Sequence, residues 1–259
     1  LYDRPYQTDY RNSVWNCGIL PVYRQQLYSV YGEYKSTARE FFATVNLTHN
    51  REWYNRIYEQ RIENGQVQRV SLPLSNHGSG YTVKSTLSKG FYDLGLKTSL
   101  MALLNISKAE QISGGQRLPY QYRLMRLEPK VIWTPNRHWE TSYQTDIRYG
   151  GSKIGERTRL APLWNVIQQV QLSYIFSPIE ASLSVDHYHN DVNEDQSVNA
   201  VFADFSVSWK SGRWQITATA TNLFDKRTYA YTRYASLESY TSWVRIRPRE
   251  FLVAIRYRL

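Results

Sequence analysis

The last eleven residues of the chain read REFLVAIRYRL (residues 249–259), and this stretch decides the expected fold. Odd-numbered positions carry large apolar or aromatic side chains: Phe251, Val253, Ile255, Tyr257 and Leu259. Even-numbered positions include Arg256 and Arg258. Because alternate side chains of a β-strand point to opposite faces, the stretch predicts a strand with one apolar face and one largely cationic face. Such a strand separates two different solvents.

The overall composition limits the classes of protein that the chain can represent. Its 259 residues suffice for one large β domain or two small ones, and 15% of them are aromatic, which is a high share. The mean hydropathy is −0.56, and no stretch approaches the roughly 18 consecutive apolar residues of a membrane-spanning helix. A net charge of +10 raises a nucleic-acid-binding alternative. The single cysteine, Cys17, excludes an internal disulfide framework and a multi-cysteine metal site.

Alternation with a period of two recurs along most of the chain. Clear examples are WETSYQTDIRY (139–149), IEASLSVDHYH (179–189) and VFADFSVSWK (201–210). A helical period would spread the charged and apolar residues of these stretches around every face, so the β period fits better. We therefore expect eleven strands, near residues 24–35, 39–50, 79–89, 91–106, 119–134, 138–150, 164–176, 179–189, 200–210, 213–223 and 249–259.

The length of these strands distinguishes two all-β architectures. Strands of a soluble β-sandwich alternate in the same way but typically run about 5–6 residues, whereas those expected here are roughly twice as long. Tyrosine or tryptophan also stands at the ends of several apolar faces, as with Trp139, Tyr149, Tyr92, Trp209 and Trp214. Aromatic ends and strands of about 9–11 residues or more are typical of a barrel that crosses a membrane.

The connections between the expected strands alternate strictly in length. Short ones lie at 35–40, 88–91, 134–137, 177–179 and 210–213, and long ones at 51–78, 107–119, 150–163, 190–199 and 225–250. All short turns then fall on one rim and all long loops on the other, which is the arrangement of an outer-membrane barrel with periplasmic turns and extracellular loops. This polarity predicts a periplasmic C-terminus and an extracellular loop segment at residues 1–20, with barrel strands, turns and loops over 21–259.

Eleven strands cannot close into an antiparallel barrel. Bacterial single-chain barrels have an even number of strands, and an open sheet would expose unpaired backbone groups to lipid at several kcal/mol each. We therefore expect the chain, residues 1–259, to be the C-terminal half of an antiparallel transmembrane β-barrel, with no plug domain among its residues.

Two segments carry a family resemblance. ITATATNLFDKRTYAY (216–231), with its Asn-Leu-Phe-Asp-Lys stretch, followed by RPREFLVAIRYRL (247–259), resembles the C-terminal end of TonB-dependent outer-membrane receptors. LPVYRQQLYSVYGEYKSTAREFFATVNLTHN (20–50) is similar in style to Bacteroidota receptors, including the SusC-like group. The resemblance implies a barrel of about 22 strands with a plugged lumen, and it implies that the apolar set of 249–259 is the assembly signal. Leu259 stands where the family usually has phenylalanine.

The same resemblance implies a function and a set of partners. The whole receptor would import a bulky nutrient, such as an oligosaccharide, a peptide or a metal chelate, across the bacterial outer membrane. Its implied partners are the N-terminal half of the barrel with its plug, TonB acting through that plug, a surface lipoprotein lid, and outer-membrane lipid or lipopolysaccharide. No nucleic acid and no cofactor is implied.

Strand parity and the last loop supply the candidate site residues. A Lys or Arg at the lipid midplane costs about 2–4 kcal/mol, so charged strand residues should face the lumen, where they contact substrate or plug or form a bracing ion-pair lattice. These residues are Lys97, Arg126, Glu128, Lys130, Asp146, Arg148, Asp204, Arg256 and Arg258. Aromatic and arginine side chains of the last loop are ligand candidates, alternatively an outer girdle. They are Tyr229, Tyr231, Tyr234, Tyr240, Trp243, Arg245 and Arg247.

Three other functions remain as alternatives. In DHYHND, Asp186 lies on the opposite parity from His187 and His189, so the sequence offers no general-base pair and no third metal ligand, and we expect neither an enzyme nor a metal site. A stand-alone outer-membrane barrel, acting as a porin-like channel or a barrel enzyme, would share the strand pattern. A soluble nucleic-acid-binding β protein would gather its positive charge on one face, whereas here cations mix with Asp and Glu along many strands.

Overall fold

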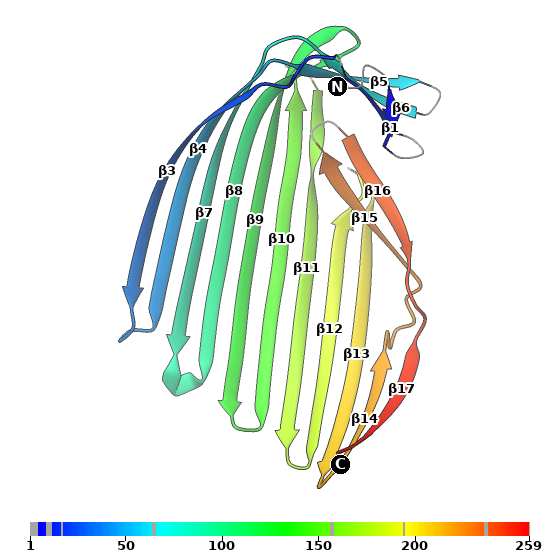
Figure 1. Cartoon of the computed structure of the whole chain (residues 1–259). Helices are drawn as coiled ribbons and strands as arrows, with labels where there is room; N and C mark the ends of the chain where they lie inside the picture. Colours follow the sequence, from blue (N-terminus) through cyan, green and yellow to red (C-terminus); the bar gives the residue numbers. More distant parts are fainter. Residues whose placement is uncertain are drawn as a thin grey trace.

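The computed structural model is a single large, strongly curved antiparallel sheet (Figure 1). It describes residues 5–8, 12–16, 18–63, 66–155, 158–193, 195–235 and 238–258. Eleven long strands form its wall: β3 (Tyr23–Ser36), β4 (Phe41–Tyr54), β7 (Asn76–Phe91), β8 (Leu96–Ser113), β9 (Gln116–Asn136), β10 (Trp139–Ile154), β11 (Thr158–Phe176), β12 (Ile179–Asp191), β13 (Ser197–Ser211), β14 (Trp214–Thr221) and β17 (Glu250–Tyr257). The expected all-β wall of eleven strands is therefore confirmed.

The wall strands pair in chain order and leave two open edges. Each of the nine wall strands between β3 and β17 has two antiparallel wall neighbours, whereas among the described residues β3 pairs only with β4 and β17 only with β14. The strands curve together into a trough, with β3 and β17 along its two margins (Figure 1). The expected antiparallel barrel wall is therefore present in an open form.

The pairing register sorts the side chains onto two faces. Phe205 lies opposite Leu183 and Ala220, and Ala220 lies opposite Phe251; the face that contains this apolar row is called the outer face below. One residue along, Ser206 lies opposite Ser182 and Thr219 on the inner face. The alternation read in the last strand thus continues laterally from strand to strand, because side chains of paired residues point the same way.

Large apolar residues of the outer face are not buried against protein. Phe205 is 41% exposed, Ile255 65% and Phe251 75%. Within the described residues, β13 has substantial contacts only with β12, β14 and β15, and the β15 contacts are made on the inner face. A soluble sandwich would cover this face with a second sheet. The alternative of a β-sandwich, which the strand lengths already disfavoured, is therefore wrong.

Aromatic rings mark both ends of the outer face. Trp139 packs on Tyr174 at 4.6 Å between ring centroids, and Trp214 packs on Tyr257 at 4.8 Å, both near the rim with the short turns. Tyr149 packs on Trp164 at 4.6 Å toward the opposite rim. Tyr92 differs from expectation, because it lies in the 3-10 turn η1 (Tyr92–Leu94) and not at a strand end.

The two rims differ as the sequence predicts, although two expected loops are strand. At the rim where the C-terminus lies, each junction between wall strands is only a few residues long (Figure 1). There the backbone N–H of Arg258, just after β17, donates to the carbonyl of Arg213, just before β14, at 2.9 Å. At the other rim, β8 and β9 continue as a ribbon to Gly114 and Gly115, whose φ angles are +59° and +75°. Two glycines with positive φ allow a tight hairpin turn, so the loop expected at 107–119 is mostly paired strand. The loop expected at 150–163 is likewise largely paired strand, in β10 and β11.

Six further strands lie in segments where only loops were expected, so the described residues form seventeen strands and not eleven. They are β1 (Tyr6–Gln7), β2 (Asn12–Trp15), β5 (Ile57–Glu63), β6 (Gln66–Leu72), β15 (Thr228–Ala235) and β16 (Glu238–Arg245). β2 pairs with β6 and β5 with β8 in parallel, which attaches β1, β2, β5 and β6 to the long-loop rim, whereas β15 and β16 form a two-stranded sheet of their own. The described residues contain no helix long and apolar enough to cross a membrane. Leu259 and Cys17 lie outside the described residues.

Candidate solute-binding cavity on the inner face

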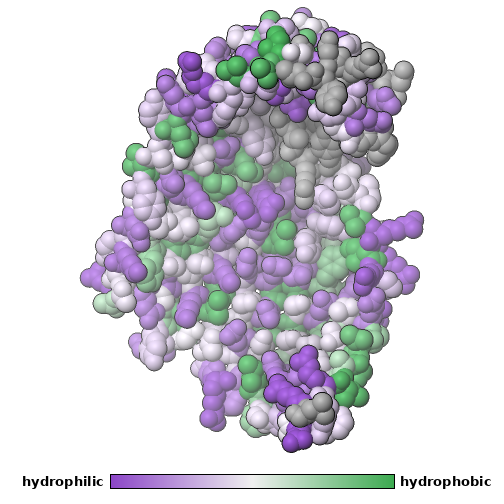
Figure 2. Space-filling view, viewed as in Figure 1, coloured by the Kyte–Doolittle hydropathy of each residue, from purple (hydrophilic) through white to green (hydrophobic). Residues whose placement is uncertain are grey.

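The register brings the charged residues expected to face the lumen onto one surface. Eight of them occupy inner-face positions of β8, β9, β10, β13 and β17: Lys97, Arg126, Glu128, Lys130, Asp146, Arg148, Asp204 and Arg256. Figure 2 shows hydrophilic residues gathered over the middle of the hollowed face. Arg258 follows the end of β17 at the short-turn rim.

Four of these charges form a compact ion cluster on β9 and β10. The guanidinium of Arg126 donates to both carboxylate oxygens of Asp146, with Nε to Oδ1 at 3.0 Å and Nη2 to Oδ2 at 2.9 Å. Arg148 donates to the same carboxylate at 2.6 Å, and Arg126 also forms an ion pair with Glu128. Two arginines and two carboxylates balance, so the cluster has no net charge. Bidentate geometry of this kind fixes the orientation of the guanidinium plane.

The other expected lumen residues lie apart from this cluster. Asp204 accepts a hydrogen bond from the backbone N–H of Asn222 at 2.7 Å, which ties β13 to the start of the last loop. Arg256 and Arg258 are near the short-turn rim, as the pairing of Arg256 with Gln215 and of Arg258 with Arg213 indicates. The expected lumen residues of the strands thus share the inner face, and four of them form the ion cluster; their contact with a substrate or a plug stays a prediction.

The β15–β16 hairpin folds back against the inner face of β12 and β13. The amide of Asn190 donates to the hydroxyl of Tyr229 at 2.5 Å, and the Tyr229 ring meets Tyr188 edge-on at 5.2 Å. Ala230 is fully buried and Thr232 is 4% exposed. The hairpin is therefore packed on the wall by both a hydrogen bond and aromatic contacts, and it does not extend into solvent as a free loop.

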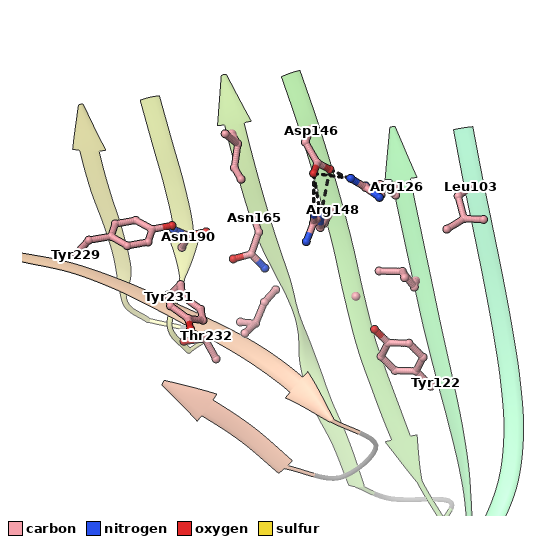
Figure 3. A pocket seen from close by; sticks show the side chains of 14 residues that line it. Leu103, Tyr122, Arg126, Asp146, Arg148, Asn165, Asn190, Tyr229, Tyr231 and Thr232 are labelled. Carbon is pink, nitrogen blue, oxygen red and sulfur yellow. Dashed lines mark hydrogen bonds and ion pairs between the residues drawn. The ribbon is translucent and has the colours of Figure 1, made fainter. Parts of the chain in front are cut away.

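A cavity of about 580 Å³ lies between the hairpin and the wall. Figure 3 shows Tyr229, Tyr231 and Thr232 of the hairpin together with Asn190 of β12 on one side, the Arg126–Asp146–Arg148 group of the wall on the other, and Asn165 between them. Its remaining labelled lining residues are Leu103 and Tyr122. The lining thus combines aromatic rings, amide groups and a neutral ion cluster, which suits a solute with many hydrogen-bonding groups.

Burial affects the tyrosine at the centre of the hairpin contact. The pKa of Tyr229 is raised above its usual value, chiefly because burial disfavours the phenolate. The hydroxyl therefore stays protonated at neutral pH. Since it accepts from Asn190, its own proton remains to donate to a bound solute.

The expected ligand residues of the last loop divide into three groups. Tyr229 and Tyr231 line the cavity, with their rings stacked at 6.1 Å. Trp243 is 72% exposed, and neither it nor the exposed Arg245 and Arg247 lines the cavity, so the loop does not gather its aromatic and cationic residues into one site. Tyr234 and Tyr240 occupy strand positions in β15 and β16, and their side chains lie outside the described residues.

The Asn222–Lys226 stretch shapes the start of the last loop. Asn222 has a positive φ of 50° and is 7% exposed, and its amide donates to the carbonyls of Lys226 and Arg247 at 2.8 and 2.9 Å. Asp225 accepts from the guanidinium of Arg227 at 2.9 Å and from the backbone N–H of Arg249 at 3.1 Å, and these bonds lower the pKa of its carboxyl. The motif therefore closes the loop that carries the hairpin.

Sequence reasoning missed several cavity residues. Asn165 and Asn190 share the inner parity with Arg148, so parity could have identified both as inner-face polar groups. Nothing in the sequence indicated that the hairpin folds inward, and Thr232 was missed for that reason.

The DHYHND segment is split as its parity predicts for Asp186, but the structure also pairs His189 with Asp191 on one face, which was not expected from the sequence. Asp186 lies on the inner face, whereas His187 bonds Gln168 at 3.1 Å and His189 pairs with Asp191 at 3.2 Å on the outer face. Among the described residues, no three His, Cys, Asp or Glu side chains group as they would around a metal ion.

Comparisons with known proteins add little to this description. No family model and no curated protein matches the chain. A solved structure, the translocator domain of the autotransporter NalP from Neisseria meningitidis, aligns over 92% of this chain and 81% of its own, with 11% sequence identity and a TM-score of 0.31. That score is too low to carry an argument, so the fold assignment rests on the strand pairing and the two faces described above.

Proposed function

We propose that the chain is the wall of a bacterial outer-membrane β-barrel that imports a bulky solute, in the manner of a TonB-dependent receptor. The observation that carries the proposal is the contrast between the two faces of one sheet: an exposed apolar outer face between aromatic ends, and an inner face with a hydrogen-bonding cavity. Outer-membrane barrels have this distribution of apolar and polar side chains. The C-terminus and short turns would be periplasmic, and the cavity would open toward the cell exterior.

The open edges support a closed assembly with further strands. The unpaired margins of β3 and β17 would each expose backbone N–H and C=O groups to lipid, which is strongly unfavourable. Strands that pair with both margins would satisfy these groups, and a barrel of about 22 strands would hold a plug. The proposal requires two partners: an N-terminal barrel half with its plug, and TonB acting through that plug. It also allows a surface lipoprotein lid.

The cavity favours a neutral, hydroxyl-rich or amide-rich solute. Its two arginines are balanced by carboxylates, so a strongly anionic metal chelate would find no uncompensated positive charge there. Tyrosine rings offer faces for stacking on sugar or peptide groups, and Asn165 and Asn190 offer amide donors and acceptors. Among oligosaccharides, peptides and metal chelates, we propose an oligosaccharide, with a peptide as the next candidate.

Membrane extraction and solute binding test the two parts of the proposal. The protein should sediment with outer membranes, require detergent for extraction and migrate faster on gels before boiling than after. Combined substitution of Asn165 and Tyr231 by alanine should weaken binding of a neutral oligosaccharide mixture by about thirtyfold, because two contacts of about 1 kcal/mol each are lost, whereas Trp243→Ala should leave binding unchanged. Extraction in buffer alone would contradict the proposal.

A stand-alone channel is the second candidate, because a hollow polar inner face is expected of a channel as well as of a receptor. Planar-bilayer recording separates the two functions: a porin-like channel conducts ions continuously, whereas a plugged receptor does not. We propose no catalytic role, in keeping with the separation of Asp186 from His187 across the wall. For a soluble nucleic-acid-binding protein, retention on nucleic acid would fall steeply with salt.

A further inference from the structure

A second concavity lies on the outer face, on the opposite side of the wall from the solute cavity. It has a volume of about 510 Å³ and is formed at the long-loop end of β4, β7, β8, β9 and β10. We call it the outer groove and define it by Arg51, Trp53, His77, Lys108 and Lys153, all of which line it. These residues have outer-face parity, so the outer groove is open to the surroundings of the barrel and not to its lumen.

Three cations of the outer groove lie on a single row across the sheet. Arg51 is paired with Ser79, Ser79 with Lys108, Lys108 with Gln121, and Gln121 with Lys153. Neighbouring strands are about 4.8 Å apart, so successive cations of the row are separated by roughly two such spacings. All three cations are exposed, and no ion pair to a carboxylate is found for any of them among the described residues.

The neighbouring charges leave the row positive. The guanidinium of Arg51 donates to His49 at 3.3 Å, and Arg123, one row nearer the short-turn rim, adds another exposed cation. Glu110 is the one outer-face carboxylate that lines the groove, and it pairs with Arg117 at 3.1 Å. An anionic ligand would therefore meet uncompensated donors, and phosphate oxygens are good acceptors for Lys and Arg.

Rows nearer the middle of the wall become aromatic and then aliphatic. In the next row, His49 stacks on Tyr81 at 4.3 Å between ring centroids and faces Tyr28 at 6.2 Å. The row below it contains Leu47, Val83 and Leu104. The order of anion-binding, ring and aliphatic rows matches the order of a phosphate headgroup, a sugar or glycerol region and acyl chains in a lipid.

We propose that the outer groove binds the phosphate of a membrane lipid headgroup, with the acyl chains of that lipid along the aromatic and aliphatic rows. The proposal rests on the assignment of the outer face to the membrane. A soluble anion would use the cation row alone, whereas the continuous sequence of three rows fits an amphiphile. Tight lipid contact at this site would anchor β4 and β7–β10 in the outer leaflet, including β9 and β10, which carry the ion cluster of the solute cavity on their other face.

Native mass spectrometry of the full-length protein in a neutral detergent tests the proposal, with lipid A as the probe. The triple variant Arg51→Gln, Lys108→Gln, Lys153→Gln should bind lipid A about a hundredfold more weakly, since each basic residue near an anionic lipid surface contributes to binding. The matched control removes three exposed cations of the short-turn rim, Arg39→Gln, Arg137→Gln and Arg213→Gln, and should bind as the wild type does.

Two further arms separate the possible sources of anion. Dephosphorylated lipid A should bind the wild type as weakly as lipid A binds the triple variant, and millimolar inorganic phosphate should not displace lipid A. Three results would each overturn the proposal. They are wild-type binding of dephosphorylated lipid A as tight as that of lipid A, a loss of binding in the control variant as large as in the triple variant, and full displacement of lipid A by inorganic phosphate. Heat-modifiable migration of the same samples reports independently on the membrane barrel. Failure of the wild type to bind lipid A with this migration retained would therefore count against the outer groove alone, whereas loss of the migration would count against the proposed function.

Discussion

At the scale of single residues, Asp146 bridges two arginines of the inner face. Its carboxylate accepts hydrogen bonds from both Arg126 and Arg148 and its side chain is 14% exposed. Asp146→Asn should lower the free energy of unfolding by about 1–3 kcal/mol, because two half-buried guanidinium groups lose their shared acceptor. Urea denaturation followed by the loss of heat-modifiable migration measures this, with Glu180→Gln, which removes the carboxylate of an exposed ion pair, as the control.

A pair of adjacent positions tests the two faces directly. Ala218 lies on the outer face opposite Val207 and Val253, whereas Thr219 lies on the inner face opposite Ser206. Ala218→Arg should destabilise the folded barrel by about 2–4 kcal/mol if that face contacts lipid, while Thr219→Arg should cost much less. Refolding into lipid vesicles measures both, and equal effects of the two substitutions would contradict the assignment of the outer face.

The carboxylate of Asp225 should make closure of the last loop depend on pH. The pKa of Asp225 is lowered first by its hydrogen bond from Arg227 and then by that from the Arg249 backbone. The contribution of Asp225 to loop closure is therefore complete above the ordinary aspartate pKa and is lost as the pH falls through the lowered value. Hydrogen exchange at the Arg249 amide should accelerate over that acidic range in the wild type, and it should already be fast at neutral pH in Asp225→Asn.

At the scale of elements, the β15–β16 hairpin docks through the Asn190–Tyr229 hydrogen bond and a small aromatic group, with a longer hydrogen bond of 3.5 Å from the Thr232 hydroxyl to the Val192 carbonyl. Asn190→Ala and Tyr229→Phe should each release the hairpin partially, and a double-mutant cycle should give a coupling energy of about 1 kcal/mol. Limited proteolysis within 228–245 provides the measurement, because a released hairpin is cleaved faster. Additive effects would mean that the Asn190–Tyr229 bond does not hold the hairpin.

The wall strands were predictable, whereas the strands of the connections were not. Alternation over nine or more residues, as in IEASLSVDHYH, leaves little choice of period or face. β5 and β15 have fewer residues and mixed polarity, and their positions depend on contacts with β8 and β12 that are distant in sequence. The ribbon ending at Gly114 and Gly115 was interpreted as a loop because a glycine pair is compatible with either structure.

At the scale of the whole molecule, the curvature of the wall separates an apolar outer face from a polar inner face. Spin labels at Val207→Cys and Ser206→Cys, in a Cys17→Ser background, should report this difference for neighbouring residues. Oxygen, which concentrates in lipid, should broaden the label at 207 more, and a water-soluble nickel chelate should broaden the label at 206 more. Similar accessibility of the two labels would contradict a membrane wall.

The sequence by itself determined the class of the fold and the approximate positions of the eleven wall strands, since a period of two links chain position to side-chain direction without further information. It did not anticipate the cations, such as Arg123, that lie on the outer face. Only the tertiary structure decided that the last loop folds inward as a hairpin, that Tyr229 meets Asn190, and that Arg51, Lys108 and Lys153 share a row. These features depend on register and on contacts between distant segments, which local alternation does not encode.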